Sequence, residues 1–294
     1  MTIERIAAHA KANLLLRVLA REDDGFHGLE TLFVLLELAD ALTAERRDSP
    51  GVTITTDADV GPPERNLAVR AAEAMLAALG RPFGVHLDLA KRIPVQGGLG
   101  GGSSDAAAAL TLVNRLADNR VPRHELLQIA ARLGSDVPYF VTNAPLALGW
   151  GHGERLLRLP ALPAAPVLLL VPELGVPTAD AFTWVDSARA GAGRRGAVAY
   201  DLEAFASWGS IGRLAGNDFE SPVFGQMPSI RAAFEALCGT NPLLCRMTGS
   251  GSTLLAVYRA DRDRDDAMLQ LGPRHGRLVP TRTLAAAPTG PITT

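Results

Sequence analysis

The residues with the clearest chemical potential form a glycine-rich segment, KRIPVQGGLGGGSSDAAAAL, from Lys91 to Leu110. Five of the six residues from Gly97 to Gly102 are glycines, and two serines and an alanine-rich stretch follow them. Glycines let backbone amides approach an anion closely, and a helix start adds unpaired N–H groups and the positive end of its dipole. The pattern predicts a loop that holds the phosphates of a nucleotide, followed by a helix over residues 104–116.

An ordinary flexible turn and two other kinds of glycine loop are alternatives to this interpretation. A turn rarely needs five glycines, because each costs backbone entropy on folding. The segment lacks the Gly-Lys-Ser/Thr ending of a Walker A motif. Its Gly98–Ser103 part resembles a dinucleotide fingerprint, but no β-α-β unit with an acidic residue about 20 positions later is apparent. We therefore favour a polyphosphate loop of another class, with Ser103 and Ser104 capping the helix or donating to phosphate.

The lysines are the second chemical signal. Of the 29 basic residues only Lys11 and Lys91 are lysines, and all the others are arginines. A lysine in such a composition indicates a position that needs the compact, rotatable ammonium of lysine rather than the planar guanidinium of arginine. Lys91 opens the glycine-rich segment, and Lys11 lies in an apolar N-terminal stretch. We expect both lysines to serve a site.

Hydrophobic patterns predict the elements that position these residues. In the first half, strands are expected over 2–20, 29–38, 51–57 and 84–90, and helices over 66–79, 104–116 and 124–133. In the second half, strands are expected over 167–171 and 254–257, and helices over 178–188, 229–237 and 261–271. Asp136 follows a helix stop at Gly134 and precedes an apolar stretch that we interpret as a strand. A change of composition near residue 155 predicts two α+β domains, 1–155 and 156–294, and residues 191–196 (GAGRRG) are typical of a mobile loop.

Composition limits the class of protein. The 294 residues are 47% hydrophobic and 20% charged, which is a globular balance. A net charge of −2 argues against a nucleic-acid binder, and no apolar run approaches the roughly 18 residues of a membrane span. The N-terminal stretch lacks the pattern of a signal peptide, and Cys238 and Cys245 are expected to be free thiols. We therefore expect a cytoplasmic protein.

Three motifs resemble those of the GHMP kinases, the superfamily of galactokinases, homoserine kinases, mevalonate kinases and phosphomevalonate kinases. Pro94 with Gly98–Ser104 resembles its central signature, and Ala8–Leu16 (AHAKANLLL) resembles its N-terminal motif with a lysine. Met247–Tyr258 (MTGSGSTLLAVY) resembles its C-terminal glycine-rich loop. The resemblance implies a two-domain α+β fold with the active site in the interdomain cleft, ATP as phosphate donor and Mg²⁺ as its companion.

Four further segments resemble one branch of this superfamily, the kinases that act on a CDP-linked methylerythritol in the non-mevalonate isoprenoid pathway. They are DGFHGLETLF (24–33), LGSDVPYF (133–140), GHGERL (151–156) and GNDFESPVF (216–224). The resemblance implies transfer of the ATP γ-phosphate to the C2 hydroxyl of that small molecule. The expected partners are therefore small molecules, without nucleic acid or membrane, and a homodimer is left open.

The resemblance also carries roles onto matching residues. It implies that Asp136 is the base that takes the proton of the attacking hydroxyl and that Lys11 is its partner. The nucleotide would be held by Asn66, Lys91, Pro94, Gly97, Gly98, Leu99, Gly100, Gly101, Gly102, Ser103 and Ser104. The metal ligands are unknown, with the hydroxyls of Ser103 and Ser104 as candidates.

The acceptor substrate would occupy a pocket with an aromatic character. The resemblance implies that His27 hydrogen-bonds the cytosine and that Phe182 stacks on it. Further contacts would come from Asn13, Phe26, Phe33, Thr178, Gly249, Ser250 and Gly251. The family usually has tyrosine where this chain has Phe26, so a hydroxyl is lost there while the ring is kept.

Two other functions stay open at this point. Another kinase of the superfamily would share the loops and the base but would lack the pocket built on His27 and Phe182, so binding of CMP distinguishes it. A ligand sensor without turnover would be expected to have degraded loops, whereas Lys11, Asp136 and both glycine loops are intact. Release of ADP in the presence of the acceptor decides between the enzyme and the sensor.

Overall fold

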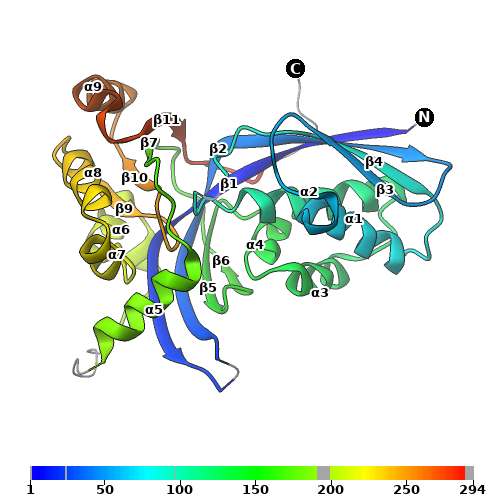
Figure 1. Ribbon diagram of the computed structural model, residues 1–294, viewed down its shortest axis with the longest axis horizontal. Helices are drawn as coiled ribbons and strands as arrows, with labels where there is room; N and C mark the ends of the chain where they lie inside the picture. The colour runs from blue at the N-terminus through cyan, green and yellow to red at the C-terminus, as the bar shows by residue number, and fades with distance from the viewer. Residues whose placement is uncertain (1, 24, 96, 191–198, 289–294) are drawn as a thin grey trace.

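Two β-sheets and the helices that cover them make up the part of the chain that the computed structural model describes, residues 2–23, 25–95, 97–190 and 199–288 (Figure 1). The loop expected over 191–196 lies outside the described residues. The first half of the chain contains β1 (Ile3–Arg21), β2 (His27–Arg47), β3 (Val52–Thr56), α1 (Leu67–Ala78), β4 (Gly84–Ala90), α2 (Gly101–Leu116), α3 (Arg123–Leu133), α4 (Val137–Thr142), β5 (Leu146–Gly151) and β6 (Arg155–Arg158). The second half contains β7 (Pro166–Val171), α5 (Thr178–Arg189), α6 (Trp208–Leu214), β8 (Gly216–Asn217), α7 (Glu220–Gln226), α8 (Pro228–Cys238), β9 (Leu244–Met247), β10 (Leu254–Val257), α9 (Asp261–Leu271) and β11 (Arg277–Arg282). Short 3-10 helices cover Pro63–Arg65, Leu202–Phe205 and Gly272–His275.

The larger sheet is organised around the long strands β1 and β2. Its order is β3-β4-β2-β1-β8, and β5 pairs with both β2 and β6. Strand β2 has 21 residues, so its C-terminal part pairs with β4 while its N-terminal part pairs with β5. The short strand β8, from the second half of the chain, pairs in parallel with β1 at Leu15 and Leu16. The two halves of the chain therefore share this sheet.

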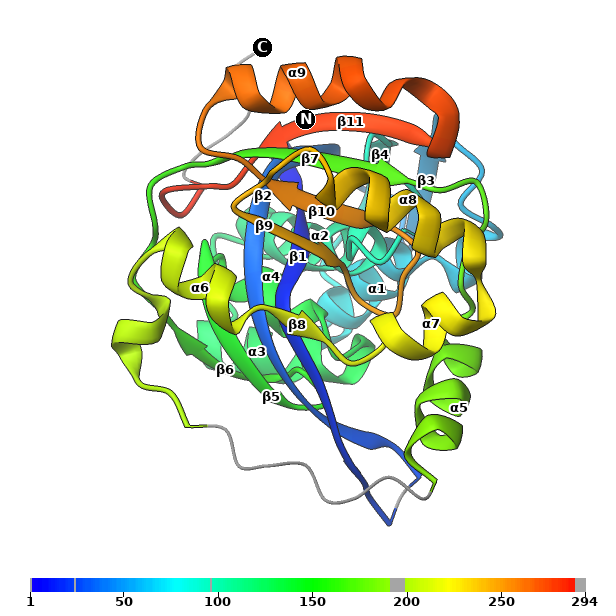
Figure 2. The same ribbon diagram turned by 90° about the vertical axis from the view of Figure 1, so that its left-hand side faces the viewer.

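The smaller sheet has the order β11-β7-β10-β9 and is buried on both faces. Side chains alternate between the faces of a strand, and β7 is apolar throughout for this reason. Val167 and Leu169 pack toward the larger sheet with Leu14, Leu32 and other residues of β1 and β2. Leu168 and Leu170 belong to the core on the opposite side, which also contains buried residues of α5, α7, α8 and α9. Figure 2 shows α8 and α9 on that side of the sheet.

The core between the two sheets fixes the relative position of the two halves. It joins residues of β1 and β2 to residues of β7 and β10, all of them buried. Each fully buried aliphatic side chain contributes about 1.5–3 kcal/mol, so this shared core holds the walls of any cavity between the halves. A separate core lies between the larger sheet and α1, α2 and α3. Figure 1 shows these helices on one face of that sheet.

Most of the elements expected from the sequence are present, and the α+β class is confirmed. The apolar strand expected after Asp136 is wrong, because residues 137–142 form α4. Pro138 lies in the first turn of this helix, where its missing N–H has no helical partner to lose. Helix α2 begins at Gly101 rather than at residue 104, and β6 crosses the predicted domain boundary at 155/156.

The helices of the described residues do not include a candidate membrane span. None of their helices combines the length and the apolar character that crossing a bilayer requires. Cys238 and Cys245 are free thiols, as expected.

Candidate active site

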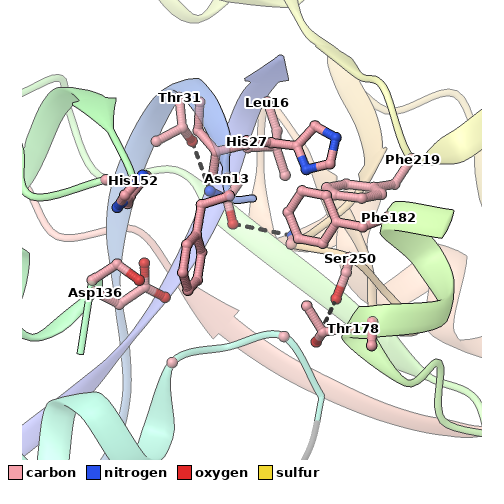
Figure 3. Close-up of a pocket in the computed structure, with 18 of the residues that line it drawn as sticks. Asn13, Leu16, His27, Thr31, Asp136, His152, Thr178, Phe182, Phe219 and Ser250 are labelled. Atoms are coloured by element: carbon pink, nitrogen blue, oxygen red, sulfur yellow. Dashed lines mark hydrogen bonds between the residues drawn. The ribbon is translucent and has the colours of Figure 1, made fainter. Parts of the chain in front are cut away.

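Two cavities meet at the central glycine loop. The larger, of about 910 Å³, is lined by β1, β2, α5, the segment around Asp136 and the loop at Gly249 and Ser250 (Figure 3). The second, of about 730 Å³, is lined by Asn66, Lys91, Pro94 and the loop from Gly97 to Ser103. Gly98 and Gly100 line both cavities. The glycine loop is therefore a wall that the two cavities share.

The start of α2 supplies the second cavity with free backbone donors. Gly100 is the N-cap with φ 70°, a left-handed conformation that favours glycine, and no side chain caps the helix. The first helical hydrogen bond runs from the Ser104 amide to the Gly100 carbonyl, 2.9 Å. The amides of Gly101, Gly102 and Ser103 precede it and have no helical partner. The capping role expected for Ser103 and Ser104 is wrong, because both lie inside the first turn and Ser104 is buried.

The two glycine loops lie against each other. A Cβ atom on Gly98 would lie 2.7 Å from the Thr248 carbonyl oxygen, and one on Gly97 would lie 2.8 Å from Thr253 Oγ1. Both distances are shorter than real Cβ contacts allow. The close approach of the central loop to the C-terminal loop therefore requires glycine at these positions.

Lys11 and Asp136 lie together at the larger cavity. Lys11 Nζ is 3.4 Å from Asp136 Oδ2, and the lysine side chain is 5% exposed while that of the aspartate is 31% exposed. The Lys11 stem passes Gly100 and its ammonium lies 5.5 Å from the centre of the Phe33 ring. Asp136 is the N-cap residue of α4, yet its side chain makes no capping hydrogen bond. Its carboxylate is therefore available to Lys11 and to a ligand.

Asn13 connects this pair to the C-terminal glycine loop. Its Oδ1 accepts hydrogen bonds from Lys11 Nζ at 2.7 Å and from the Gly249 amide at 3.0 Å. Its Nδ2 donates to Thr31 Oγ1 at 2.7 Å, and its own amide donates to Thr248 Oγ1 at 3.0 Å. These internal bonds use most of the hydrogen-bonding capacity of the side chain. Asn13 lines the larger cavity, but the geometry favours an organising role over the substrate contact that we expected.

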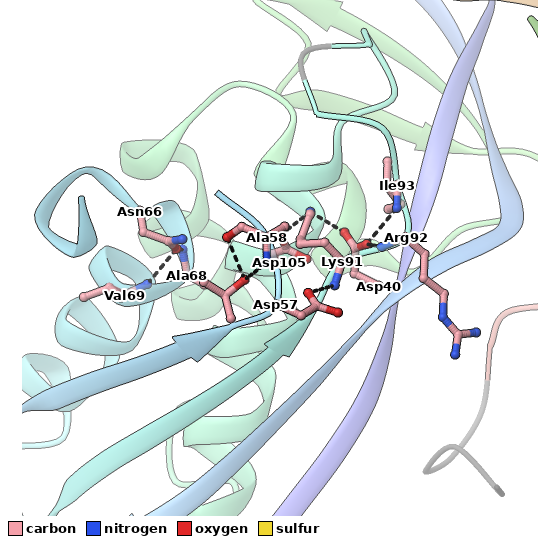
Figure 4. Close-up of polar contacts among 11 residues, drawn as sticks. Asp40, Asp57, Ala58, Asn66, Ala68, Val69, Lys91, Arg92, Ile93 and Asp105 are labelled. Carbon is pink, nitrogen blue, oxygen red and sulfur yellow. Dashed lines mark hydrogen bonds and ion pairs between the residues drawn. The ribbon is translucent and has the colours of Figure 1, made fainter. Parts of the chain in front are cut away.

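Lys91 lies at the second cavity within a buried cluster of charges (Figure 4). Its Nζ donates to Asp40 and, at 2.8 Å, to Asp105 Oδ2. Burial raises the pKa of Asp105 to about 7, because the opposing effect of Lys91 is incomplete and Asp40 adds a like charge. Burial lowers the pKa of Lys91, but Asp105 and Asp40 raise it by more, so that the ammonium stays charged. Asn66 caps α1 by accepting from the Ala68 and Val69 amides, which leaves its Nδ2 group for a ligand.

The far end of the larger cavity carries the aromatic residues expected for a base. The His27 and Phe182 rings stack with centroids 5.0 Å apart, and the Phe182 and Phe219 rings form a T-shaped contact with centroids 4.9 Å apart (Figure 3). Phe26 is 64% exposed at the rim. Thr178 and Ser250 share a hydrogen bond of 3.1 Å across the cavity. Thr178 follows the N-cap Pro177 and is the first residue of α5.

Nearly all of the predicted site residues line one of the two cavities. The larger cavity has Lys11, Asn13, Phe26, His27, Phe33, Asp136, Thr178, Phe182, Gly249 and Ser250. The second has Asn66, Lys91, Pro94, Gly97, Gly98, Leu99, Gly100, Gly101, Gly102 and Ser103. Ser104 and Gly251 are buried and line neither cavity.

Three residues at or beside the larger cavity have no predicted role. Asp186 accepts a hydrogen bond from His27 Nε2 at 2.7 Å. His152 lies against the Phe26 ring with centroids 5.2 Å apart, and Asn217 Nδ2 donates to the carbonyls of Met247 and Gly249. Asp186 could have been found, because it follows Phe182 by four positions and one turn of a helix places both on the same side. His152 and Asn217 lie in the segments 151–156 and 216–224, which carry the family resemblance, but no spacing singles them out.

The described residues contain no group of three or more His, Cys, Asp or Glu side chains that could hold a metal ion. Single oxygen donors do line the second cavity. Ser103 is one of them, and Asp105 has an oxygen, Oδ1, that is buried without a hydrogen-bond partner. A hard cation that keeps waters and binds nucleotide phosphates needs only one or two such protein oxygens. The donor set therefore fits Mg²⁺.

Comparison with protein families identifies both halves of the chain. The model of the GHMP kinases N terminal domain matches residues 66–144, and that of the GHMP kinases C terminal domain matches residues 201–277. A protein of Cupriavidus metallidurans named 4-diphosphocytidyl-2-C-methyl-D-erythritol kinase is 38% identical over 264 residues, covering 90% of this chain and 87% of its own. A protein of the same name from Paraburkholderia phytofirmans is 37% identical, covering 90% and 88%.

Solved structures agree with the sequence comparison. A crystal structure of 4-(cytidine 5'-diphospho)-2C-methyl-D-erythritol kinase superposes with a TM-score of 0.81 at 34% identity, covering 95% of this chain and 98% of the other. A homoserine kinase from Cytophaga hutchinsonii superposes with a TM-score of 0.69 at 18% identity, covering 98% and 96%. The second likeness is one of fold alone.

Proposed function

We infer the reaction from the premise that this chain belongs to the family of 4-diphosphocytidyl-2-C-methyl-D-erythritol kinases, a branch of the GHMP kinases. It is an ATP-dependent kinase of the non-mevalonate isoprenoid pathway. It transfers the γ-phosphate of ATP to the C2 hydroxyl of 4-diphosphocytidyl-2-C-methyl-D-erythritol. The assignment of individual residues to this reaction, given below, is our proposal.

The observation that carries the proposal is the position of the Lys11–Asp136 pair. Lys11 Nζ and Asp136 Oδ2 are 3.4 Å apart, and both residues line the larger cavity. Gly98 and Gly100 line this cavity and the second one. A phosphate held at the shared wall would face a hydroxyl bound beside Asp136. This arrangement supports the acceptor in the larger cavity and ATP in the second.

Phosphoryl transfer needs positioning and charge stabilisation more than covalent chemistry. In the proposed step, Asp136 takes the proton of the C2 hydroxyl, the hydroxyl oxygen bonds to the γ-phosphorus, and ADP leaves with the bridging oxygen. The Lys11 ammonium stabilises the negative charge that develops at the attacking oxygen. The bond from Lys11 to Asn13, 2.7 Å, keeps the ammonium in place for this role.

ATP would lie with its phosphates on the amides of Gly101, Gly102 and Ser103, which have no helical partner. Lys91 would act from within its cluster with Asp40 and Asp105, where it keeps a positive charge near the cavity. Asn66 would contact the nucleotide through Nδ2. Mg²⁺ would neutralise phosphate charge when bound, with Ser103 and Asp105 as its protein oxygens.

The cytidine would bind at the far end of the larger cavity. His27 would hydrogen-bond the base and Phe182 would stack on it, because both rings line the cavity, and a T-shaped contact with Phe219 holds the Phe182 ring. Phe26 would add its ring from the rim. A cytoplasmic location, the absence of nucleic-acid partners and an assembly up to a homodimer stay predictions.

A coupled assay of ADP release tests the proposed function. We expect ADP release to depend on 4-diphosphocytidyl-2-C-methyl-D-erythritol and to be absent with homoserine or mevalonate. CMP should bind in calorimetry, because the cytidine pocket exists before the reaction. ADP release with mevalonate and no heat from CMP would instead identify another kinase of the superfamily. Binding of both ligands without ADP release would identify a sensor.

A further inference from the structure

Asp186 holds the edge of the His27 ring. The distance between His27 Nε2 and Asp186 Oδ1 is 2.7 Å, and the two residues are 159 positions apart in the chain. The histidine side chain is 7% exposed and that of the aspartate is 43% exposed. Phe182, one helical turn before Asp186 on α5, covers the face of the same ring. One helix therefore constrains both the plane and the edge of this imidazole.

The contact determines which nitrogen carries hydrogen. A carboxylate only accepts hydrogen bonds, so Nε2 must be the protonated nitrogen. In a neutral imidazole the other nitrogen, Nδ1, is then an acceptor. Among the residues that the structure describes, none is hydrogen-bonded to Nδ1. A ligand in the cavity would meet an acceptor at this atom.

We propose that Asp186 is a positioning residue that holds His27 as the Nε2–H tautomer, so that Nδ1 accepts a hydrogen bond from the cytosine amino group and the site selects cytosine over uracil. This proposal rests on the proposed function, because it needs a cytidine nucleotide in the larger cavity. Asp186 does not touch the base itself. Its effect passes through the histidine.

The chemistry of the two bases explains the selectivity. Cytosine presents an amino group at C4, which donates to an acceptor, whereas uracil presents a carbonyl oxygen there. An Nδ1 lone pair opposite that carbonyl would leave two acceptors facing each other without a hydrogen. A buried polar group that loses its partner costs more than the bond itself contributes. Without Asp186, the imidazole could take the Nδ1–H tautomer and donate to the uracil carbonyl, so the preference should weaken.

The tautomer of the wild-type enzyme gives a first test that needs no mutation at Asp186. Long-range ¹H–¹⁵N spectra of the histidine-labelled full chain, with CMP at saturation, distinguish the two neutral tautomers and the imidazolium. The signal that disappears in His27→Gln assigns His27 among the six histidines. We expect the Nε2–H tautomer. An Nδ1–H tautomer or a doubly protonated ring in the complex would overturn the proposal.

Base selectivity gives the second test, with a matched control on the same helix. In Asp186→Ala we expect the ratio of CMP to UMP affinity to fall about tenfold, the KM for the acceptor to rise, and the KM for ATP and kcat to stay near wild type. Asp186→Glu should restore the ratio. Asp180→Ala removes the same charge from an exposed position of α5 that lines neither cavity, and it should leave the ratio of CMP to UMP affinity unchanged.

Measurements on the wild type and on Asp186→Ala distinguish a failure of the proposed function from a failure of the role of Asp186. A wild-type enzyme that binds no CMP and releases no ADP with the acceptor refutes the proposed function. A wild-type enzyme that does both, while Asp186→Ala keeps its melting temperature and its CMP-to-UMP ratio, refutes only the role of Asp186.

Discussion

Replacing Gly100 with alanine should reduce turnover far more than it reduces stability. Gly100 caps α2 with φ 70° and lines both cavities. A Cβ atom there would lie 2.8 Å from Phe140 Cζ and 2.9 Å from Lys11 Cγ. Non-bonded carbon atoms prefer about 3.5–4.0 Å. The methyl group must therefore displace the Lys11 stem or the Phe140 ring by about 0.7 Å or more.

Two separate costs follow from this displacement. The left-handed conformation costs alanine about 1–2 kcal/mol in folding stability. The displacement of Lys11 affects catalysis, because a misplacement of about 1 Å can reduce a rate about 100-fold. Lys11 has little room to adapt, since Asn13 and Asp136 hold its ammonium at 2.7 and 3.4 Å. We expect kcat to fall about 100-fold.

Gly80→Ala is the matched control for the backbone cost. Gly80 has φ +79°, and a Cβ atom there meets nothing within 4 Å. It lies after the end of α1 and lines neither cavity. Both variants should therefore lose comparable stability from the backbone, while Gly80→Ala keeps wild-type turnover.

The assay combines urea unfolding with coupled ADP release at saturating ATP and acceptor. Saturation separates kcat from any change in the binding of either substrate. A kcat of Gly100→Ala within threefold of wild type would refute the argument from the displaced lysine. An equal loss of kcat in both variants would show that the backbone cost, rather than the contact with Lys11, is responsible.

Four further changes test the remaining parts of the site. Asp136→Asn should lower kcat about 10²- to 10⁴-fold while calorimetry shows normal binding of CMP and ATP; retained turnover would contradict its role as base. Lys11→Arg should lower kcat at least tenfold despite the preserved charge, because the planar guanidinium of arginine does not fit the space that the compact lysine ammonium occupies. Near-normal steady-state kinetics would contradict this steric requirement. Phe182→Leu should weaken CMP about three- to tenfold through the loss of aromatic stacking, with the KM for ATP unchanged, and an equal effect on both ligands would point to a misfolded cleft instead. Burial raises the pKa of Asp105 to about 7 in the folded chain, whereas its ordinary value is 3.8. The unfolded chain therefore loses this proton at a lower pH, so the folding stability of the wild type falls as the pH rises from 3.8 to about 7. Asp105→Asn has no such proton, so its melting temperature should rise relative to that of the wild type over this range, and a difference that does not change with pH would contradict the raised pKa.

The sequence predicts local elements well where one pattern dominates. The alternation in residues 84–90 and the helical period in 261–271 correspond to β4 and α9. The segment VPYFV forms a helix rather than the predicted strand. Apolar residues give similar patterns on a short helix and on a short strand, and Pro138 in the first turn favours the helix. Strand β8 has two residues and is defined only by its pairing with β1. No local pattern predicts such a strand.

Candidate site residues can be predicted where a sequence motif contains them. Their hydrogen-bond partners cannot be predicted where those partners are distant in the sequence. Lys11 and Asp136 were found through motifs, although 125 positions separate them in the numbering of the chain. The internal use of the Asn13 side chain was not found, since its partners come from Thr31 and from the loop at Gly249. The contact from His27 to Asp186 likewise depends on how α5 packs, which the sequence of either segment does not encode alone.

The structure also changes the explanation of the glycine run. The sequence predicts one reason for all five glycines, the close approach of backbone amides to phosphate. Contacts within the protein already require three of them: Gly97 and Gly98 face the C-terminal loop, and Gly100 faces Lys11 and Phe140. A Cβ atom on Gly102 would meet its nearest neighbour, Leu67 Cδ1, at 3.8 Å, which is an ordinary contact. The protein itself has room for a side chain at Gly102, and this residue lines the second cavity. At Gly102 the reason for a glycine is therefore still the one predicted from the sequence, the approach of a nucleotide.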